Sequence, residues 1–322
     1  MIGRKRVAFQ GESGANSHIA CREVYPEFES VAFATFDECF DALEQGVVDL
    51  AMIPVENNTA GRVADIHRLL PGSRLHIIGE HFLRVRHCLL ALPGVALETL
   101  TTAHSHPQAL AQCRSSLQEL GLTPVPAADT AGAAREVADA NDPTRAAVAT
   151  RLGGETFGLH VVKEDLEDHP ENMTRFIILS REELRAAPGI GPIVTTFVFK
   201  VRNTPAALYK ALGGFATNGV NMTKLESYMV DGQFFATQFL ADIEGHPDEV
   251  SAGHAFEELT YYADYRILGV YRANPVREWF KTADPSRLTG RAEPVAPGAR
   301  VGDGRRPAPR GLAEHLATVT SI

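Results

Sequence analysis

The chain has 322 residues, of which 44% are hydrophobic and 22% are charged, with a formal net charge of −9 at pH 7. That length suits two domains, and the average composition excludes a wholly disordered chain, a collagen and a coiled coil. The negative charge argues against a broad surface for nucleic acid or an anionic membrane, although one locally positive pocket could still bind a small acidic metabolite.

Cysteines and apolar runs narrow the class further. The four cysteines lie far apart, which argues against close-pair zinc or redox motifs and indicates reduced thiols. The apolar stretch after the basic N-terminus is too short for a signal peptide, and no apolar run approaches the roughly 18 residues of a membrane span. We therefore expect a cytoplasmic protein that binds neither membranes nor nucleic acids.

Short apolar runs alternate with helical patterns in the first part of the chain. Strands are predicted at RVAFQ, VDLAMIPV, HCLLAL, TLTTAH, AAVAT and TRFIIL, and helices from about Asn16, Ala60 and Pro107. This alternation is typical of an α/β fold with parallel strands and crossover helices. Because ligands bind where such strands end, the loops GESGANS, ENNTAG and HSHPQ are the candidate site.

The loop GESGANSH follows a strand and precedes a helix. Gly11, Ser13 and Gly14 would let backbone amides approach a phosphate or carboxylate at the helix N-terminus. A plain glycine-rich turn, with Ser13, Asn16 or Ser17 as the N-cap, explains the same residues. The full dinucleotide and Walker patterns are both absent.

The next loop carries Glu56, Asn57, Asn58 and Thr59 between a strand and a helix. Helix capping needs only one or two of these polar residues. The surplus favours a polar pocket in which Glu56 holds or donates a proton and the amides orient a carboxylate or hydroxyl.

In HSHPQALAQC, Ser105 and Gln108 match a capping box, which accounts for both without a ligand. His104 and His106 could ligate a metal from an extended segment, but no further ligand cluster stands at a recognisable interval. A Ser-His-Asp triad lacks its strand-elbow context. We expect no metal site.

The segment EDHPENMTRFIIL places Asn172, Thr174 and Arg175 at the entry to an apolar strand. An arginine there is either a solvated residue at the strand start or a bidentate clamp for a carboxylate.

A linker at 186–192 (AAPGIGP) precedes the second part of the chain. The strand IVTTFVFKV, the helix TPAALYKALGGFATNG and the strands VNMTKLESYMV and FFATQFLADI follow, the last two meeting at a strong hairpin signal, Asp231-Gly232. A helix over about 248–262 and the strand YRILGVYR complete a β-α-β-β-α-β, ferredoxin-like plan. The Pro-, Gly-, Arg- and Ala-rich segment 282–322 is expected to be a disordered tail.

Four segments, VAFQGESGANSH, PVENNTAGRV, SHPQALAQC and NMTRF, together resemble the prephenate dehydratase family. The second part resembles the ACT regulatory domain that follows the catalytic part in these enzymes. The resemblance implies a two-lobed, periplasmic-binding-protein-like catalytic domain at 1–182, with lobes at about 1–80 plus 160–182 and 81–159. It implies an ACT domain at 193–273.

The implied reaction is decarboxylative dehydration of prephenate to phenylpyruvate in L-phenylalanine biosynthesis, without metal or organic cofactor. The family's essential threonine falls on Thr174, which would hydrogen-bond the leaving hydroxyl beside the catalytic-site candidates Glu56 and Asn57. Glu56 is a candidate proton source if burial raises its pKa. The substrate-binding candidates are Gly11, Ser13, Gly14, Asn58, Ser105, Gln108, Gln112, Arg175 and Phe176. The loop amides and Arg175 would clamp the carboxylates.

The ACT resemblance implies phenylalanine as an effector and a homodimer or dimer of dimers. The effector-binding candidates are Ala206, Ala207, Leu208, Asn221, Glu226 and Ser227. The family's Pro-Gly-Ala-Leu is Pro205-Ala206-Ala207-Leu208 here, and its Glu-Ser-Arg-Pro is Glu226-Ser227-Tyr228-Met229. Because Ala206 narrows the approach to the backbone that glycine allows, the sequence supports activity more directly than feedback.

Two alternatives remain open. An arogenate dehydratase would accept an amino group where prephenate has a keto group, and a non-catalytic amino-acid-sensing protein would have kept the cleft. The presence of Thr174, Glu56 and Asn57 favours an enzyme over a sensor.

Overall fold

The computed structural model describes residues 4–229 and 236–282. Met1–Arg272 form one compact unit with three sheets, and helix α10 (Val276–Thr282) belongs to the segment that follows. The predicted turn at Asp231-Gly232, and the predicted tail beyond Thr282, lie outside the described residues.

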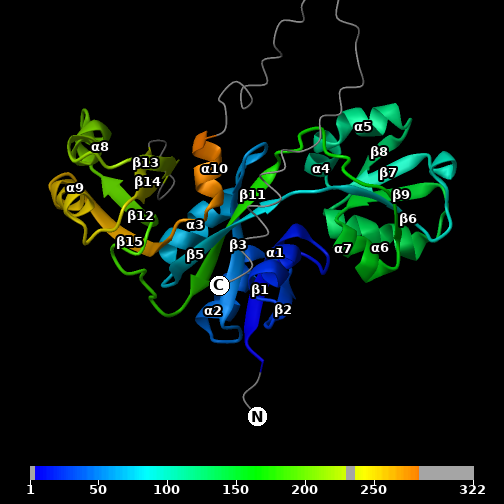
Figure 1. Ribbon diagram of the computed structural model, residues 1–322, viewed down its shortest axis with the longest axis horizontal. Coiled ribbons are helices and arrows are strands. Elements are labelled where there is room, and N and C mark those ends of the chain that lie inside the picture. Colours follow the sequence, from blue (N-terminus) through cyan, green and yellow to red (C-terminus); the bar gives the residue numbers. More distant parts are fainter. Residues whose placement is uncertain (1–3, 230–235, 283–322) are drawn as a thin grey trace, which may run out of the picture. The chain divides into compact units, whose positions relative to one another are not determined.

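The first sheet has the order β2-β1-β3-β11-β5, with the short β4 paired to β3 (Figure 1). Its elements are β1 (Arg6–Gln10), α1 (Asn16–Val24), β2 (Glu29–Phe33), α2 (Phe36–Glu44), β3 (Leu50–Asn57), β4 (Gly61–Arg62), α3 (Ala64–Gly72), β5 (His76–Arg84) and β11 (Met173–Ser180). Strand β1 is parallel to β2 and β3, whereas β11 is antiparallel to β3 and β5. The expectation of parallel strands is therefore wrong for β11, because this strand returns to the sheet that β5 leaves.

The second sheet has the order β10-β6-β9-β7-β8. Its elements are β6 (Cys88–Ala91), the 3-10 helix η1 (Leu97–Thr99), β7 (Thr102–Ser105), α4 (Pro107–Gln112), α5 (Arg114–Glu119), β8 (Thr123–Pro126), α6 (Thr130–Ala140), β9 (Arg145–Ala149), α7 (Arg151–Phe157) and β10 (His160–Lys163). Because β10 pairs with β6, the chain returns to the first sheet after Lys163, close to the expected boundary at about 160.

Two local expectations differ from the structure. The helix predicted from about Ala60 begins at Ala64, because Gly61 and Arg62 pair with the end of β3 as β4. The capping box at Ser105 is wrong, because Ser105 is the last residue of β7 and its hydroxyl donates to the Val148 carbonyl at 2.6 Å. The N-cap of α4 is His106, whose Nδ1 accepts from the Gln108 amide.

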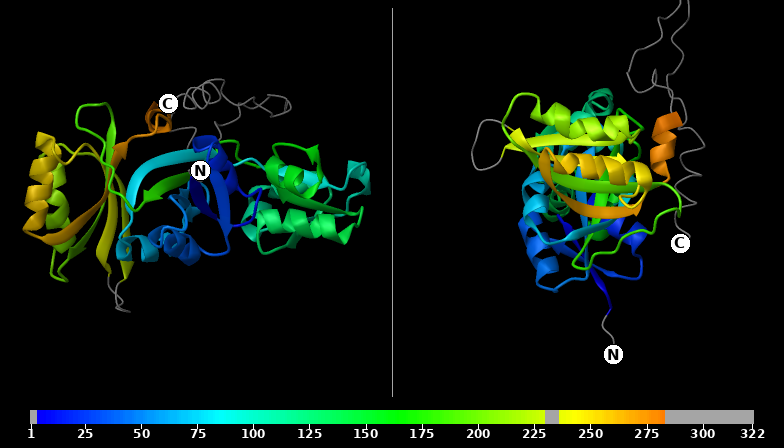
Figure 2. Two further views of the ribbon diagram at one scale, coloured as in Figure 1. Left: turned by 90° about the horizontal axis from the view of Figure 1, so that it is seen from below. Right: turned by 90° about the vertical axis from the view of Figure 1, so that its left-hand side faces the viewer.

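The third sheet has the order β13-β14-β12-β15, which confirms the predicted β-α-β-β-α-β plan. Its elements are β12 (Ile193–Val201), α8 (Ala207–Thr217), β13 (Met222–Met229), β14 (Ala236–Glu244), α9 (Val250–Thr260) and β15 (Ala263–Arg272). Helices α8 and α9 cover one face of this sheet (Figure 2). Phe197, Phe215 and Phe256 form its aromatic core, with ring centroids 4.9 to 5.5 Å apart.

A glycine brings the third sheet against the first. A Cβ atom at Gly269 of β15 would lie 2.2 Å from the carbonyl oxygen of Ile77 in β5. Only glycine permits this approach of the two backbones. Beside it, the Arg266 guanidinium donates to the carbonyl of Pro71 at 2.8 Å. The third sheet is thereby held close to β5, the neighbour of β11.

Ala206 occupies an unusual backbone position at the start of α8. Its φ of +59° lies in the left-handed region, which favours glycine. We expect Ala206→Gly to raise the free energy of unfolding by about 0.5–1 kcal/mol, because relief of backbone strain exceeds the entropic cost of glycine. Urea denaturation would measure this. Ala207→Gly, one residue inside α8, should lower stability, and an equal response of both variants would contradict the assignment of strain.

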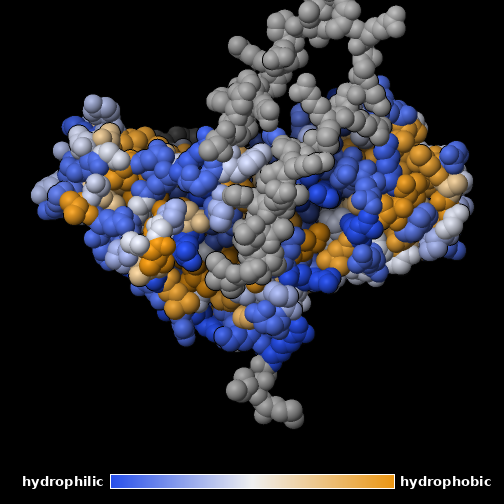
Figure 3. Space-filling view, viewed as in Figure 1, coloured by the Kyte–Doolittle hydropathy of each residue, from blue (hydrophilic) through white to orange (hydrophobic). Residues whose placement is uncertain are grey.

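The cysteines, the helices and the surface of the described residues bear on the predictions of reduced thiols and of no membrane span. The four cysteines are buried and form no disulfide. Among the described residues, no helix has both the length and the apolar character that crossing a membrane requires. On the face drawn in Figure 3, hydrophilic surface is interspersed with smaller hydrophobic patches.

Candidate active site

The site candidates of β11 divide between two faces of the first sheet. Thr174 is in register with Asn57, and Arg175 is adjacent to Glu56 in the same ladder. Successive residues of a strand point to opposite faces. The residues predicted to form one polar pocket therefore form two separate groups. One is a cluster of amides and hydroxyls around Thr174, and the other is a charged network around Arg175.

Asn57 determines the direction of the hydrogen bonds at Thr174. The Oδ1 atom of Asn57 accepts from the backbone N–H groups of Thr59, at 3.0 Å, and Ala60, at 2.8 Å. Because backbone N–H groups only donate, they identify the oxygen end of this amide. Nδ2 of Asn57 then donates to Thr174 Oγ1 at 3.0 Å and to Asn172 Oδ1 at 2.7 Å. Since Thr174 accepts from Asn57, it can give its own proton to a ligand.

Two further candidates join this cluster. Asn58 donates to the Glu171 carbonyl at 2.7 Å and accepts from the Met173 amide at 2.8 Å, which ties the loop to the start of β11. Gln112, at the end of α4, donates to Thr59 Oγ1 at 3.1 Å. Helix α4, which follows strand β7 of the second sheet, thus contributes a side chain to the cluster on the first sheet.

Other substrate-binding candidates lie elsewhere. Ser105 is fully buried with its hydroxyl on a backbone carbonyl, and Phe176 is buried in the apolar core of the first sheet. The exposed Gln108 bonds His106 through its backbone amide. These contacts support packing and capping roles for the three residues.

The glycine-rich loop packs against the second sheet. The amide of Gly11 donates to the Phe33 carbonyl at 2.9 Å, and that of Gly14 donates to His18 Nδ1 at 3.0 Å. A Cβ at Gly14, where φ is +94°, would lie 2.6 Å from the Cα of Gly153. The expectation that these two amides clamp a carboxylate is wrong, because protein groups already use them. Ser13 remains the exposed member of the loop.

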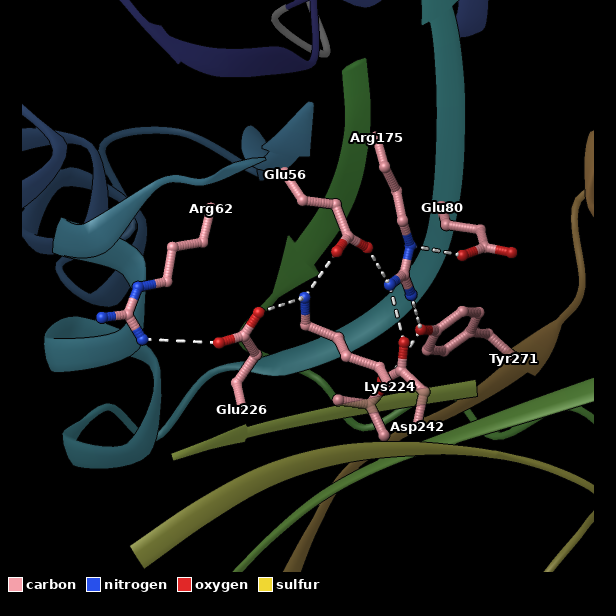
Figure 4. A network of polar contacts seen from close by, with 9 residues as sticks. Glu56, Arg62, Glu80, Arg175, Lys224, Glu226, Asp242 and Tyr271 are labelled. Carbon is pink, nitrogen blue, oxygen red and sulfur yellow. Dashed lines mark hydrogen bonds and ion pairs between the residues drawn. The ribbon is translucent and has the colours of Figure 1, made fainter. Parts of the chain in front are cut away.

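Arg175 is enclosed by acceptors (Figure 4). Its side chain is 5% exposed; Nε donates to Glu80 at 2.8 Å, and Nη1 donates to Asp242 at 2.6 Å and Glu56 at 2.8 Å. Nη2 donates to the Tyr271 hydroxyl at 2.9 Å. The predicted carboxylate clamp is therefore wrong: Arg175 binds carboxylates of its own chain, and Asp242 and Tyr271 belong to the third sheet.

Burial and the neighbouring acidic groups have opposite effects on the pKa of Arg175. Burial alone would lower the pKa of Arg175, but Asp242, Tyr271, Glu80 and Glu56 raise that pKa well above its ordinary value. Arg175 therefore stays charged. Removal of Arg175 would leave the buried carboxylates of Glu80 and Asp242 without this counter-charge.

Glu56 cannot serve as the predicted neutral acid. Its Oε2 lies 2.5 Å from Lys224 Nζ, and its Oε1 accepts from Arg175. Burial alone would raise the pKa of Glu56, but Arg175 and Lys224 lower it overall. The carboxylate is ionised at neutral pH, which corrects the expectation of a raised pKa.

This shift makes a pH-dependent prediction for Glu56. A lowered folded-state pKa contributes stability that is present above the unfolded value of about 4.3 and is lost as the pH falls through the folded value. The difference in unfolding free energy between wild type and Glu56→Gln should therefore shrink as the pH drops below that unfolded value. Urea midpoints across the acid range would measure it, and a difference independent of pH would contradict the role of Arg175 and Lys224.

The effector candidates also meet charged partners. Lys224 lies 3.8 Å from Glu226, and Arg62 of β4 reaches Glu226 at 3.4 Å (Figure 4). Arg62 also donates to the Ser227 carbonyl at 3.3 Å. Asn221 donates to Glu244 at 2.9 Å. The remaining candidates, Ala206, Ala207 and Leu208, lie at the start of α8.

Several residues of both groups are not among the sequence candidates. They are His87 beside Gln112, and Glu80, Lys224, Asp242 and Tyr271 around Arg175. A signal exists for some of them: single charged residues interrupt otherwise apolar strands in HIIGEHF and FLADI. Among the residues that the structure describes, no group of three or more His, Cys, Asp or Glu side chains could hold a metal ion.

Known proteins resemble this chain over most of its length. A family model described as prephenate dehydratase matches residues 7–184. A bifunctional N-acyl-homoserine lactone acylase/prephenate dehydratase of Komagataeibacter europaeus is 48% identical over 278 residues, which cover 86% of this chain and 99% of that protein. The chloroplastic arogenate dehydratase/prephenate dehydratase 2 of Arabidopsis thaliana is 40% identical over 279 residues, covering 83% of this chain and 73% of the relative.

A solved structure extends the likeness. The prephenate dehydratase of Arthrobacter aurescens, in complex with L-Phe, superposes with a TM-score of 0.76 at 29% identity. The match covers 83% of this chain and 90% of that one.

Proposed function

Because the chain belongs to the prephenate dehydratase family of lyases, we propose that it converts prephenate to phenylpyruvate, carbon dioxide and water. One observation carries the proposal on the structural side. The Asn57 amide donates to Thr174 Oγ1, so the Thr174 hydroxyl has its proton available for the departing hydroxyl of a substrate.

The chemistry needs positioning more than a strong acid. The bond from the ring to its carboxylate breaks, its electrons move through the diene, and the bond from the ring to the para hydroxyl breaks at the opposite end. Carbon dioxide and hydroxide leave, and one proton taken up from solvent converts the hydroxide to water. Aromatisation drives the step, while Thr174 stabilises the negative charge that develops on the leaving oxygen.

Residue roles follow from this geometry. Thr174 is the hydrogen-bond donor to the leaving group, Asn57 orients Thr174, and Gln112 reaches the same cluster from the second sheet. Glu56 contributes as an ionised partner of Arg175 and Lys224. This role replaces that of a proton source.

Arogenate is a second candidate substrate, of the same chemical class as prephenate. Relatives from Arabidopsis thaliana and Petunia hybrida carry the name arogenate dehydratase, and the relative at 48% identity is also named an N-acyl-homoserine lactone acylase. We propose prephenate as the principal substrate, with arogenate as the alternative. The acylase activity is an outcome that the same test covers.

We further propose that the third sheet and its helices form an ACT-type regulatory domain that binds phenylalanine. The β-α-β-β-α-β order supports this, as does the relative solved with L-Phe. Lys224 and Asp242 contact Glu56 and Arg175, neighbours of the Thr174 cluster, and so provide a route from effector to active site. The dimeric state and the cytoplasmic location stay predictions.

The test offers the purified full chain prephenate, arogenate and an N-acyl-homoserine lactone in separate assays, with and without phenylalanine. We expect phenylpyruvate from prephenate at the highest kcat/KM, and a lower rate when phenylalanine is present. Phenylalanine formed from arogenate at a higher kcat/KM would reverse the substrate assignment. Tight phenylalanine binding without turnover of any substrate would favour the sensor.

A further inference from the structure

We propose that His87 is a positioning residue for the Thr174 cluster and acts through Gln112. The inference rests on the proposed dehydratase function. His87 is 2% exposed and lies between β5 and β6, where the chain first passes from the first sheet to the second. Its Nε2 is 3.0 Å from Gln112 Oε1. Nδ1 is buried and has no hydrogen-bond partner among the described residues.

The directions of the neighbouring hydrogen bonds identify which ring nitrogen of His87 carries the proton. Thr59 donates its hydroxyl proton to Asn57 Oδ1, at 2.8 Å. Having donated that proton, Thr59 Oγ1 accepts from Gln112 Nε2 at 3.1 Å. The amide oxygen of Gln112 must then face His87. An amide oxygen only accepts, so Nε2 of His87 carries the hydrogen.

These bonds form a one-way chain of donors that runs from His87 through Gln112, Thr59 and Asn57 to Thr174. Its far end is anchored independently, because two backbone amides identify the oxygen of Asn57. Within residues 4–229 and 236–282, the near end has a single orienting contact of this kind, the His87 imidazole. Without that donor, the Gln112 amide could turn over and present its oxygen to Thr59.

The surroundings hold both ends of the His87–Gln112 contact in place. The His87 amide donates to Glu167 at 2.9 Å, and its carbonyl accepts from the Leu166 amide at 3.0 Å. The Asp168 amide donates to the Gln112 carbonyl at 2.7 Å. Burial lowers the pKa of His87 against the opposing effects of Gln112 and Glu167, so the imidazole is neutral at neutral pH. The series of donors from His87 to Thr174 requires a neutral imidazole with its one proton on Nε2.

The consequence for catalysis is a loss of orientation of the Gln112 amide and the Thr59 hydroxyl, which border the Asn57–Thr174 pair, without loss of any group that touches the reacting atoms. Small misplacements of a catalytic group lower turnover strongly, and here we expect about a 10-fold fall in kcat for His87→Leu, with a smaller change in KM. His87→Gln keeps an N–H donor on a side chain of similar reach. It should recover most of the lost kcat.

A double-mutant cycle separates positioning from a merely structural role. If His87 acts through Gln112, then His87→Leu added to Gln112→Leu should cause no further fall in kcat. Multiplicative effects, or a His87→Gln variant as slow as His87→Leu, would overturn the proposal. His104→Leu is the matched control: His104 is half-buried and pairs with Thr102 at 3.1 Å, outside the chain of donors, so its kcat should equal that of the wild type.

A spectroscopic readout does not depend on activity. Nitrogen NMR of the full chain labelled in its 12 histidines, with the His87 signal assigned by its absence in His87→Gln, should show the neutral Nε2–H form. Gln112→Leu should shift that signal and leave that of His104 unchanged. A proton on Nδ1 would overturn the proposal, whereas a wild type inactive on both dehydratase substrates would overturn the proposed function alone.

Discussion

Thr174→Ala is expected to lower kcat on prephenate by about 100- to 1,000-fold, the usual effect of removing one donor that stabilises developing negative charge. The rate falls because of the direction of the hydrogen bond between Asn57 and Thr174. Asn57 donates to Thr174 Oγ1, so the Thr174 hydroxyl proton, which alanine lacks, is the one that points to the substrate. Stability should fall by only about 1 kcal/mol, because Asn57 Nδ2 keeps Asn172 as an acceptor. Steady-state kinetics and urea denaturation on the same preparation would measure both.

Two substitutions at the same position serve as controls. Thr174→Ser keeps the hydroxyl and should retain most of the rate, whereas Thr174→Val keeps the shape and should be as slow as alanine. A wild-type rate in Thr174→Val would remove Thr174 from the mechanism.

Arg175→Met should lower the free energy of unfolding by about 3–5 kcal/mol, because it leaves buried carboxylates without their counter-charge. Glu80 and Asp242 are 8% and 1% exposed, so water cannot replace the guanidinium. Such a loss is a large part of the roughly 5–15 kcal/mol that stabilises a typical protein. Urea denaturation at neutral pH would measure it.

Arg62 provides the comparison for Arg175. It belongs to the same network, but its side chain is 50% exposed and pairs with Glu226 at 3.4 Å. Arg62→Met should cost less than about 1 kcal/mol, as exposed ion pairs do. Equal losses for Arg62→Met and Arg175→Met would contradict the importance of burial. Arg175→Lys should fall between them, because one ammonium cannot reproduce the fork of donors.

Local patterns predicted much of the fold. RVAFQ and IVTTFVFKV match β1 and β12 residue for residue, because alternating or continuous apolar runs with turn residues at both ends specify strands strongly. The order of the third sheet followed from its sequence of elements. The direction of β11 did not, since antiparallel pairing with β3 depends on where the chain returns after the second sheet.

Local sequence patterns also predicted part of the site. Asn57, Asn58 and Thr174 lie together as expected, because strand ends gather polar residues. The environment of Arg175 could not be predicted, since its partners Glu80 and Asp242 lie 95 and 67 residues away in the chain. The alternation of strand faces was nevertheless a usable signal, as it separates Arg175 from Thr174.

The pKa of Glu56 shows why charge could not be inferred from residue types alone. Burial raises this pKa, while Arg175 and Lys224 lower it, and the second effect wins. The balance depends on Lys224, which is 168 residues away in sequence. Only the folded arrangement identifies that partner.

The most direct test of the donor role of Thr174 is the prephenate turnover of Asn57→Asp. This change keeps the shape of the side chain but replaces the amide donor with a carboxylate oxygen, which would accept the proton of Thr174 and withdraw it from the substrate. We predict a kcat as low as that of Thr174→Ala, with no further fall when the two changes are combined. An Asn57→Asp enzyme that turns over prephenate at the wild-type rate would contradict the role of Thr174 as the donor to the leaving group.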